Sequence, residues 1–346
     1  MENLEPLFNK VLSTIKAYPD QFEQAWQEAR EIKLDNPALY QNIVFCGMGG
    51  SALGARMVKS LMADQFSIPF EIYTEYNLPK YADEKTLVIA GSYSGNTEET
   101  VSCFNEAIEK GCGVFVITTG GKLADLAREA NKAAYVFEPK HNPSEQPRMA
   151  LGYSSSALLS FLNANAFISL SEGEVQNTIS EMRENVEIFS KEVDSNPIKI
   201  LSEELFNKIP ILVASEHLIG AVHAIKNQLN ESSKTFSAIF DIPELNHHLM
   251  EGLPKPDSNK ETLRFLFFES SLYSDKISKR YPLTKEVVEK NNVKTSSFKL
   301  KGVSKMSQVY EVLTAGSFMA YFLTKKYNIN PMEIPWVDYF KAKLSS

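Results

Sequence analysis

The feature that most constrains the fold is a repeated alternation of short apolar runs with longer segments of helical periodicity. Five runs in the first half are rich in β-branched and aromatic residues and have the length of buried strands: Asn42–Cys46, Pro69–Tyr73, Thr86–Gly91, Gly113–Thr118 and Ala133–Phe137. Segments between them, such as Ala52–Met62 and Glu98–Lys110, have the apolar spacing of helices. The alternation predicts repeated βαβ units, and therefore a parallel sheet covered on both faces.

The second half repeats the same order of elements with unrelated sequence. We expect strands at Ile209–Ala214, Thr235–Phe240, Leu263–Glu269 and Lys294–Leu300, with helices at Leu218–Asn230, Ser274–Lys290 and Ser304–Tyr327. The prediction is an α/β protein of two doubly wound parallel-sheet domains, each with three α/β/α layers, with N-terminal helices and a C-terminal helical tail. We place the units at residues 1–165, 166–327 and 328–346, and expect the two domains to share one site.

Composition excludes several classes of function. The chain has 346 residues, which is enough for two cores, and its 36 Lys and Arg against 43 Asp and Glu give a net charge of −7 without a polybasic block. Nucleic acid and anionic membranes are therefore not expected partners. Three cysteines without a CxxC pair do not suggest a disulfide framework or a zinc site. With no signal peptide or apolar span, we expect a cytoplasmic protein.

The first strand leads directly into the glycine-rich turn CGMGGSALGA. Gly49 and Gly50 allow a close backbone approach, and Ser51 stands near the start of the next helix, where free N–H groups favour an anion. Gly47, Gly49 and Ala52 also fit the GxGxxA spacing of nucleotide-binding proteins, with Glu75 as a ribose ligand. This second interpretation predicts a nicotinamide-dependent dehydrogenase, and a third is that the glycines serve only the turn.

The third strand leads into GSYSGNTEET. Ser92, Ser94 and Thr97 place three hydroxyls within six residues, and Asn96 or Thr97 is in position to cap the next helix. Hydroxyls and free amides together form a neutral cradle for a phosphate monoester. Because the loop lacks the lysine of a Walker A motif, a nucleoside triphosphate is not expected. An ordinary helix cap explains one hydroxyl but not three.

These two loops together resemble the sugar isomerase (SIS) domain, in which the serine and threonine loop binds the phosphate of a sugar phosphate. The duplication extends the resemblance over nearly the whole chain, to the phosphoglucose isomerases. The segments QPRMALGY, NQLNESSK and PELNHHLMEG resemble the archaeal and bacterial bifunctional phosphoglucose/phosphomannose isomerases. The resemblance implies an isomerase that interconverts glucose 6-phosphate, and in bifunctional members mannose 6-phosphate, with fructose 6-phosphate through an enediol.

The resemblance also implies roles for particular residues. Glu231, at a predicted helix end, is the base, and His247 is the ring-opening acid/base, contributed by the neighbouring subunit of a homodimer. An imidazole suits that role because its pKa lies near neutrality. The adjacent His248 is the alternative. For an arbitrary glutamate, a solvated helix end would be the ordinary interpretation.

Two further cations are candidates. Arg148 opens a predicted helix after a proline-rich loop, where a guanidinium could stabilise an enediolate. The tail lysine of the family corresponds best to Lys341, with Lys343 as the alternative. Bifunctional members have a tail threonine just before this lysine that makes room for the mannose epimer. Residues 328–346 contain no threonine, so the epimer preference is left open.

Aldose–ketose isomerisation by proton transfer requires no metal or redox cofactor, and His141, His217 and His223 lack the spacing of metal ligands. The main rival is a regulatory protein that binds sugar phosphates without catalysis. Glu231 and His247 discriminate against it, because a sensor needs neither. A change in nicotinamide absorbance with substrate would instead identify a dehydrogenase.

Overall fold

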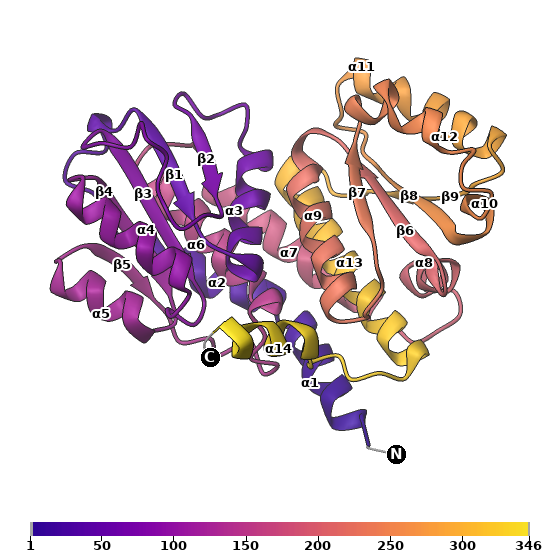
Figure 1. The fold of residues 1–346 in the computed structure, drawn as a ribbon, viewed down its shortest axis with the longest axis horizontal. Helices are drawn as coiled ribbons and strands as arrows, with labels where there is room; N and C mark the ends of the chain where they lie inside the picture. Colours follow the sequence, from indigo (N-terminus) through magenta and orange to yellow (C-terminus); the bar gives the residue numbers. More distant parts are fainter. Residues whose placement is uncertain (1–2, 345–346) are drawn as a thin grey trace.

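The computed structural model describes residues 3–344 and contains two parallel sheets, one in each half of the chain (Figure 1). The first sheet has the order β2-β1-β3-β4-β5 and the second has the order β7-β6-β8-β9. Every neighbouring pair of strands is parallel. The central position that β1 and β3 hold in the first sheet is therefore held by β6 and β8 in the second, which confirms the predicted duplication of two doubly wound units.

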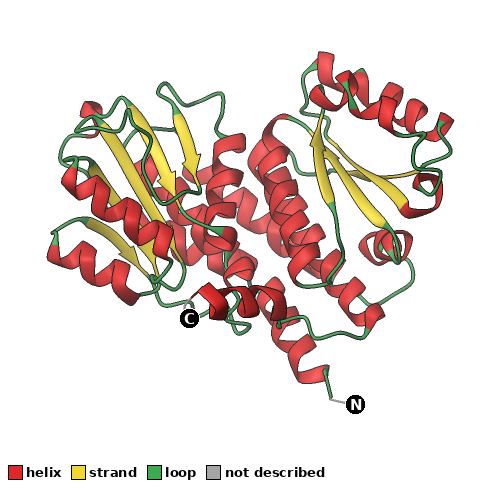
Figure 2. Ribbon diagram, viewed as in Figure 1, coloured by secondary structure: helices red, strands yellow, loops and turns green. Residues whose placement is uncertain are grey.

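The first sheet consists of β1 (Asn42–Cys46), β2 (Phe70–Tyr73), β3 (Thr86–Ser92), β4 (Gly113–Thr118) and β5 (Ala133–Val136). Its crossover helices are α3 (Gly49–Leu61), α4 (Glu98–Glu109) and α5 (Gly121–Glu129). The strand β3 is buried along its whole length, as expected for a central strand with helices on both faces (Figure 2). The carboxyl ends of β1 and β3 carry the two glycine-containing loops.

The second sheet consists of β6 (Ile209–Ala214), β7 (Ala238–Asp241), β8 (Leu263–Glu269) and β9 (Lys294–Lys299). Its helices are α9 (Ile219–Glu231), α10 (Asn259–Thr262), α11 (Asp275–Ser278) and α12 (Arg280–Lys290), with 3-10 turns η3 (Glu216–Leu218), η4 (Glu244–His247) and η5 (Leu249–Gly252). The single helix predicted over 274–290 is wrong, because α11 ends before α12 begins. Pro282 lacks the N–H that a continuous helix would pair with the carbonyl of Ser278.

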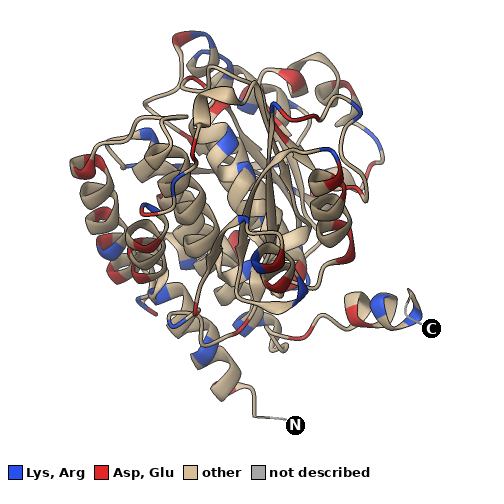
Figure 3. Ribbon diagram, turned by 90° about the vertical axis from the view of Figure 1, so that its left-hand side faces the viewer, with Lys and Arg blue, Asp and Glu red and all other residues tan. Residues whose placement is uncertain are grey.

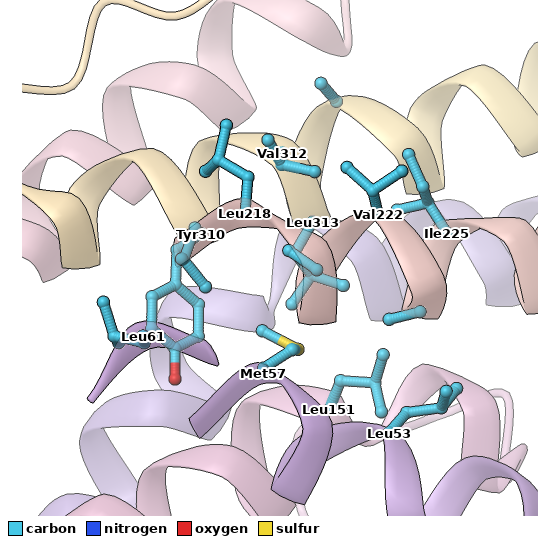
Figure 4. Packing of buried hydrophobic residues seen from close by; sticks show 14 of the residues in the cluster. Leu53, Met57, Leu61, Leu151, Leu218, Val222, Ile225, Tyr310, Val312 and Leu313 are labelled. Atoms are coloured by element: carbon cyan, nitrogen blue, oxygen red, sulfur yellow. The ribbon is translucent and has the colours of Figure 1, made fainter. Parts of the chain in front are cut away.

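The remaining helices join the two halves. They are α1 (Glu5–Lys16), α2 (Tyr18–Ala29), α6 (Leu151–Ala164), α7 (Glu172–Phe189), α8 (Pro197–Leu205), α13 (Lys305–Tyr327) and α14 (Pro335–Leu344), with 3-10 turns η1 (Pro37–Leu39) and η2 (Pro147–Met149). One continuous apolar core runs from the first sheet through these helices to the second. Figure 4 shows its centre, where Leu53 and Met57 of α3 face Val222 of α9 and Leu313 of α13. None of the helices in residues 3–344 is long and apolar enough to cross a membrane.

The helices α3 and α9 pack against each other in opposite directions. Early in α9, a Cβ on Gly220 would overlap the carbonyl of Arg56, late in α3. At the other end of α9, the Gln228 amide donates to the carbonyl of Arg148, whose backbone lies against Gly50 at the start of α3. Because each helix runs antiparallel to its own strands, the two sheets also point in opposite directions. The carboxyl edge of the first sheet therefore shares one side of the molecule with the amino edge of the second.

Candidate active site

The two loops at the carboxyl edge of the first sheet are bonded to each other. The N–H of Tyr93, in the loop after β3, donates to the Ser51 hydroxyl oxygen at 2.9 Å. Ser51 lies in the first turn of α3, so this bond joins the start of α3 to the loop that follows β3. The Ser51 oxygen accepts in this bond, which leaves its own hydrogen available to a ligand.

The predicted hydroxyls of the second loop lie together. The Ser92 and Thr97 hydroxyl oxygens are 2.9 Å apart, and Ser92 also accepts from the N–H of Gly95 at 3.1 Å. Ser94 is exposed at the tip and accepts from the N–H of Asn96 at 3.3 Å. The loop is therefore held in shape by its own hydroxyls before any ligand arrives.

The helices that follow these loops begin without side-chain caps. Thr97 occupies the N-cap position of α4, but its hydroxyl bonds to Ser92 and caps nothing. The start of α3 has no cap bond either. Ser171, Asn196 and Ser304 cap α7, α8 and α13 with their side chains, whereas other helices such as α5, α6 and α9 also begin without a side-chain cap. The ordinary-cap interpretation of Thr97 is therefore wrong. No side chain caps the first turn of α3 or of α4, although the Ser51 N–H in α3 donates to the Met48 carbonyl at 3.0 Å.

Two glycines are required by close packing at this edge. A Cβ at Gly50 would lie 2.9 Å from the backbone nitrogen of Arg148. Gly95 has a φ of +71°, and a Cβ there would overlap the carbonyl of Gly120. Gly50 brings the first loop against the segment that carries Arg148, so this glycine helps build the site as well as the turn.

Arg148 is buried between the two halves of the molecule. It lies in η2 and not at the start of α6 as predicted, because Ala150 separates the 3-10 turn from that helix. Its Nε donates to the Ser232 hydroxyl at 3.1 Å and its Nη1 to the Gln146 side-chain oxygen at 2.8 Å. Desolvation lowers the pKa of Arg148, and the opposite charge of Glu231 works against that shift. These hydrogen bonds fix the orientation of the guanidinium.

Glu231 is the last residue of α9 and approaches this guanidinium. Its Oε2 lies 3.5 Å from the Arg148 Nη1, and its side chain is 29% exposed. It stands at the amino edge of the second sheet, not at the carboxyl edge where open α/β sheets usually carry ligands. Since the two sheets point in opposite directions, this edge shares a side of the molecule with the loops of the first sheet. The structure thus brings Glu231, Arg148 and the serine loops to one side.

The chain after α13 passes over the same region. The Arg148 Nη2 donates to the carbonyls of Pro331 and Met332 at 2.9 and 3.1 Å. The tail continues into α14, which carries Lys341 and Lys343 on an exposed helix that projects from the body of the molecule (Figure 3). The structure places both candidate lysines on this helix and does not choose between them.

His247 lies on the other side of the molecule. It ends η4, beyond the carboxyl end of β7, and is exposed. The neighbouring Asn246 is fixed there by hydrogen bonds with Thr284 and Arg280 of α12. Within residues 3–344 the structure gives no contact between His247 and either Glu231 or Arg148. Of the predicted catalytic residues, Glu231 and Arg148 meet within one chain, whereas His247 lies on the side of the molecule away from them.

Sequence reasoning missed a buried polar network beneath Arg148. The Tyr18 hydroxyl lies 3.0 Å from that of Ser317, and Gln228 donates to Tyr18 and accepts from Ser317. The Gln228 amide also donates to the Arg148 carbonyl at 2.9 Å. These residues come from α2, α9 and α13, and no local motif links them. Lys234 and Ser232, beside Glu231, were likewise not singled out, although both lie in the NQLNESSK segment.

Comparisons with known proteins agree with this arrangement. A model of the SIS domain matches residues 40–168, and a model of the bacterial phospho-glucose isomerase C-terminal SIS domain matches residues 194–344. A bifunctional phosphoglucose/phosphomannose isomerase of Caldicellulosiruptor bescii is 30% identical over 335 residues, covering 94% of this chain and 96% of the relative. A second bifunctional phosphoglucose/phosphomannose isomerase, from Aquifex aeolicus, is 28% identical, and the match covers 97% of this chain and 98% of the relative.

A solved structure has the same fold over nearly the whole chain. The crystal structure of a hypothetical protein from Thermus thermophilus superposes with a TM-score of 0.77 at 17% identity, covering 99% of this chain and 94% of that one. At this identity the match concerns the fold alone. The arrangement of two SIS-type sheets therefore agrees with a solved structure.

Proposed function

Because the chain belongs to the bifunctional phosphoglucose/phosphomannose isomerase family, we propose that it interconverts glucose 6-phosphate and fructose 6-phosphate by proton transfer through an enediol. The observation that carries this proposal is the 3.5 Å approach of Glu231 to Arg148, on the same side of the molecule as two uncapped helix starts. A carboxylate, a fixed cation and an anion cradle are the parts that this reaction needs. Both curated relatives are named for two isomerase activities, so mannose 6-phosphate is proposed as a second aldose.

In this proposal the phosphate binds at the carboxyl edge of the first sheet. The hydroxyls of Ser51 and Ser94 donate to its oxygens, together with the amides of the glycine turn at Gly49 and Gly50. Of Ser92 and Thr97, one hydroxyl donates to the other and the second donates to the phosphate. The starts of α3 and α4, which no side chain caps, support the proposal, because a dianion is favoured at helix N-termini. Phosphate binding at this edge directs the sugar carbons towards Arg148 and Glu231.

The proton transfer is assigned to Glu231. Its carboxylate removes the proton from C2 of the open-chain aldose and returns it to C1, while the hydroxyl proton passes from O2 to O1, which produces the ketose without a net change in the enzyme. Negative charge develops on the enediolate oxygens during this step. The Arg148 guanidinium, buried and held by four hydrogen bonds, can stabilise that charge without reorganising.

Ring opening is assigned to His247 of a second subunit. One chain leaves His247 exposed on the side of the molecule away from Glu231, which supports a site completed across a homodimer. Lys341 is proposed as the tail cation, with Lys343 as the alternative. The proposed enzyme acts in the cytoplasm on a small anionic substrate, and requires neither nucleic acid nor membrane.

A substrate assay tests this function. The purified enzyme is given glucose 6-phosphate, mannose 6-phosphate or glucosamine 6-phosphate, and fructose 6-phosphate is measured by a coupled reaction, with unphosphorylated glucose as the control. We expect turnover of glucose 6-phosphate and none of glucose. Tight binding of the sugar phosphate without turnover would favour the regulatory alternative. A change in nicotinamide absorbance without the coupling enzymes would favour a dehydrogenase.

A further inference from the structure

Lys234 holds the turn that carries Glu231. It follows the end of α9 by three residues and has a φ of +54°, which non-glycine residues seldom adopt. Its ammonium donates to the carbonyl of Glu231 at 2.6 Å and to that of Ser232 at 3.4 Å. A strained backbone with a defined set of partners is the kind of feature that the surrounding structure maintains for a function.

The same ammonium also binds the tail. Lys234 donates to the carbonyls of Asn330 at 3.3 Å and Glu333 at 2.6 Å. Arg148 binds the two carbonyls between them, those of Pro331 and Met332. Four successive tail carbonyls are thus bound by two cations. Both of these cations also touch Glu231, Lys234 at its carbonyl and Arg148 at its carboxylate.

We propose that Lys234 is a positioning residue that, with Arg148, clamps residues 330–333 against the turn carrying Glu231. The clamp fixes the backbone of Glu231 relative to the tail segment that leads into α14. This inference rests on the proposed function, because it assigns Lys234 a part in the same reaction. Lys234 touches no substrate atom in this proposal and acts through the backbone of Glu231 and of the tail.

The clamp depends on a charged ammonium, because its three N–H donors are shared among the carbonyls of Glu231, Ser232, Asn330 and Glu333, and a neutral amine would have only two donors and no charge. Desolvation and the neighbouring Arg148 lower the pKa of Lys234 to about 8, whereas Glu333 and Glu231 oppose this shift. These are the charged groups that face it from η2, the tail and α9. As the pH rises through about 8, the ammonium loses its proton and the clamp should weaken.

Two substitutions test the proposal. Lys234→Arg keeps a cation that does not titrate in this range, and Lys234→Met keeps the apolar stem without a charge. We expect the wild-type kcat to fall at alkaline pH, above an apparent pKa near 8. Lys234→Arg should keep most of the kcat and lose this alkaline limb of the pH profile. Lys234→Met should lose about tenfold in kcat at pH 7. Lys260→Met, in the exposed helix α10, is the matched control and should have the kcat and the pH profile of the wild type.

A second readout is independent of catalysis. Amide hydrogen exchange of peptides covering residues 330–344 should be faster at pH 7 in Lys234→Met than in the wild type, and unchanged in Lys234→Arg. Unchanged exchange and kcat in Lys234→Met would overturn the proposal, as would an alkaline limb near pH 8 that persists in Lys234→Arg. A wild type without isomerase activity would overturn the proposed function instead, and the exchange comparison would still decide whether Lys234 holds the tail.

Discussion

Glu231 and His247 flank the same edge strand from opposite ends. Glu231 closes α9 before β7 begins and contacts Arg148, while His247 ends η4 after β7 has finished and is held near α12 through its neighbour Asn246. A strand of this length keeps its two ends apart by roughly 13 Å at about 3.3 Å per residue. If both residues serve one reaction, each site takes its base from one chain and its histidine from another.

This arrangement predicts complementation between two inactive variants. Glu231→Gln and His247→Ala should each lose most activity alone. Mixed in equal amounts under conditions of subunit exchange, they should recover about a quarter of the wild-type activity, because half of the dimers are mixed and each mixed dimer has one intact site. The measurement is the rate of fructose 6-phosphate conversion before and after mixing.

The control pairs Glu231→Gln with His248→Ala, which separates the two adjacent histidines. If His248 were the functional residue, His248→Ala would be inactive, and its mixture with Glu231→Gln would recover activity. The mixture of Glu231→Gln with His247→Ala would then recover none. Absence of recovery despite demonstrated exchange of labelled subunits would place both residues in one subunit's site.

The serine loop predicts a loss of affinity for phosphorylated ligands. Ser94→Ala removes an exposed hydroxyl at the tip of the loop, and a charge-assisted hydrogen bond is worth about 1.5–3 kcal/mol, so substrate or inhibitor binding should weaken by about tenfold or more. Calorimetry with a non-reacting sugar phosphate measures this directly.

The corresponding loop of the second sheet supplies a matched control. Ser271 is an exposed serine that follows β8, and β8 occupies in the second sheet the place of β3 in the first. Ser271→Ala should leave affinity unchanged. Equal affinities of the wild type and of all three variants Ser92→Ala, Ser94→Ala and Thr97→Ala would rule out phosphate binding at this loop.

The environment of His223 in α9 predicts how the free energy of unfolding changes at acidic pH. Desolvation, with Arg56 and Lys226 nearby, lowers the pKa of His223 from 6.5 to about 4. Between these values the unfolded chain binds more protons than the folded chain, so stability should fall as the pH falls from about 6.5 towards 4. Urea unfolding measures the free energy of unfolding at pH 7 and pH 4.5, and the decrease between them should be smaller in His223→Gln than in the wild type. The control His248→Gln, at an exposed histidine, should show the same decrease as the wild type.

Much of the fold follows from local patterns. The predicted bounds of β1, β4, β6 and β8 agree with the structure to the residue, because a buried strand in a parallel sheet is a nearly continuous apolar run. The helix α8 was not predicted, although Asn196 before Pro197 is a start signal and the Asn196 side chain does cap the helix. The domain boundary placed between residues 165 and 166 stays a prediction.

The site was only partly accessible from sequence. The two loops that we propose to bind phosphate carry their own signal, because glycines and hydroxyls cluster directly after strands. The approach of Arg148 to Glu231 joins residues 83 positions apart and depends on the packing of α3 against α9, so only the family resemblance pointed to the pair. Lys234 has no sequence signal, since its four carbonyl partners come from a turn and a tail that meet only in the folded chain.

The central claim is that Glu231 transfers the proton. Glu231→Gln keeps the volume and a hydrogen-bonding amide but removes the proton acceptor, so the variant should fold and bind substrate while its turnover falls by about 10² to 10⁴. Circular dichroism and inhibitor binding are the controls for folding and for the rest of the site.

The most direct measurement is isomerisation in deuterated water, with the wild type and Glu231→Gln compared by mass spectrometry of the sugar phosphate. We predict that the wild type places solvent deuterium at C1 of the ketose or C2 of the aldose, in an amount that internal return reduces, and that Glu231→Gln slows both turnover and incorporation. Wild-type turnover in Glu231→Gln, or a product free of deuterium after many turnovers, would contradict proton transfer by Glu231.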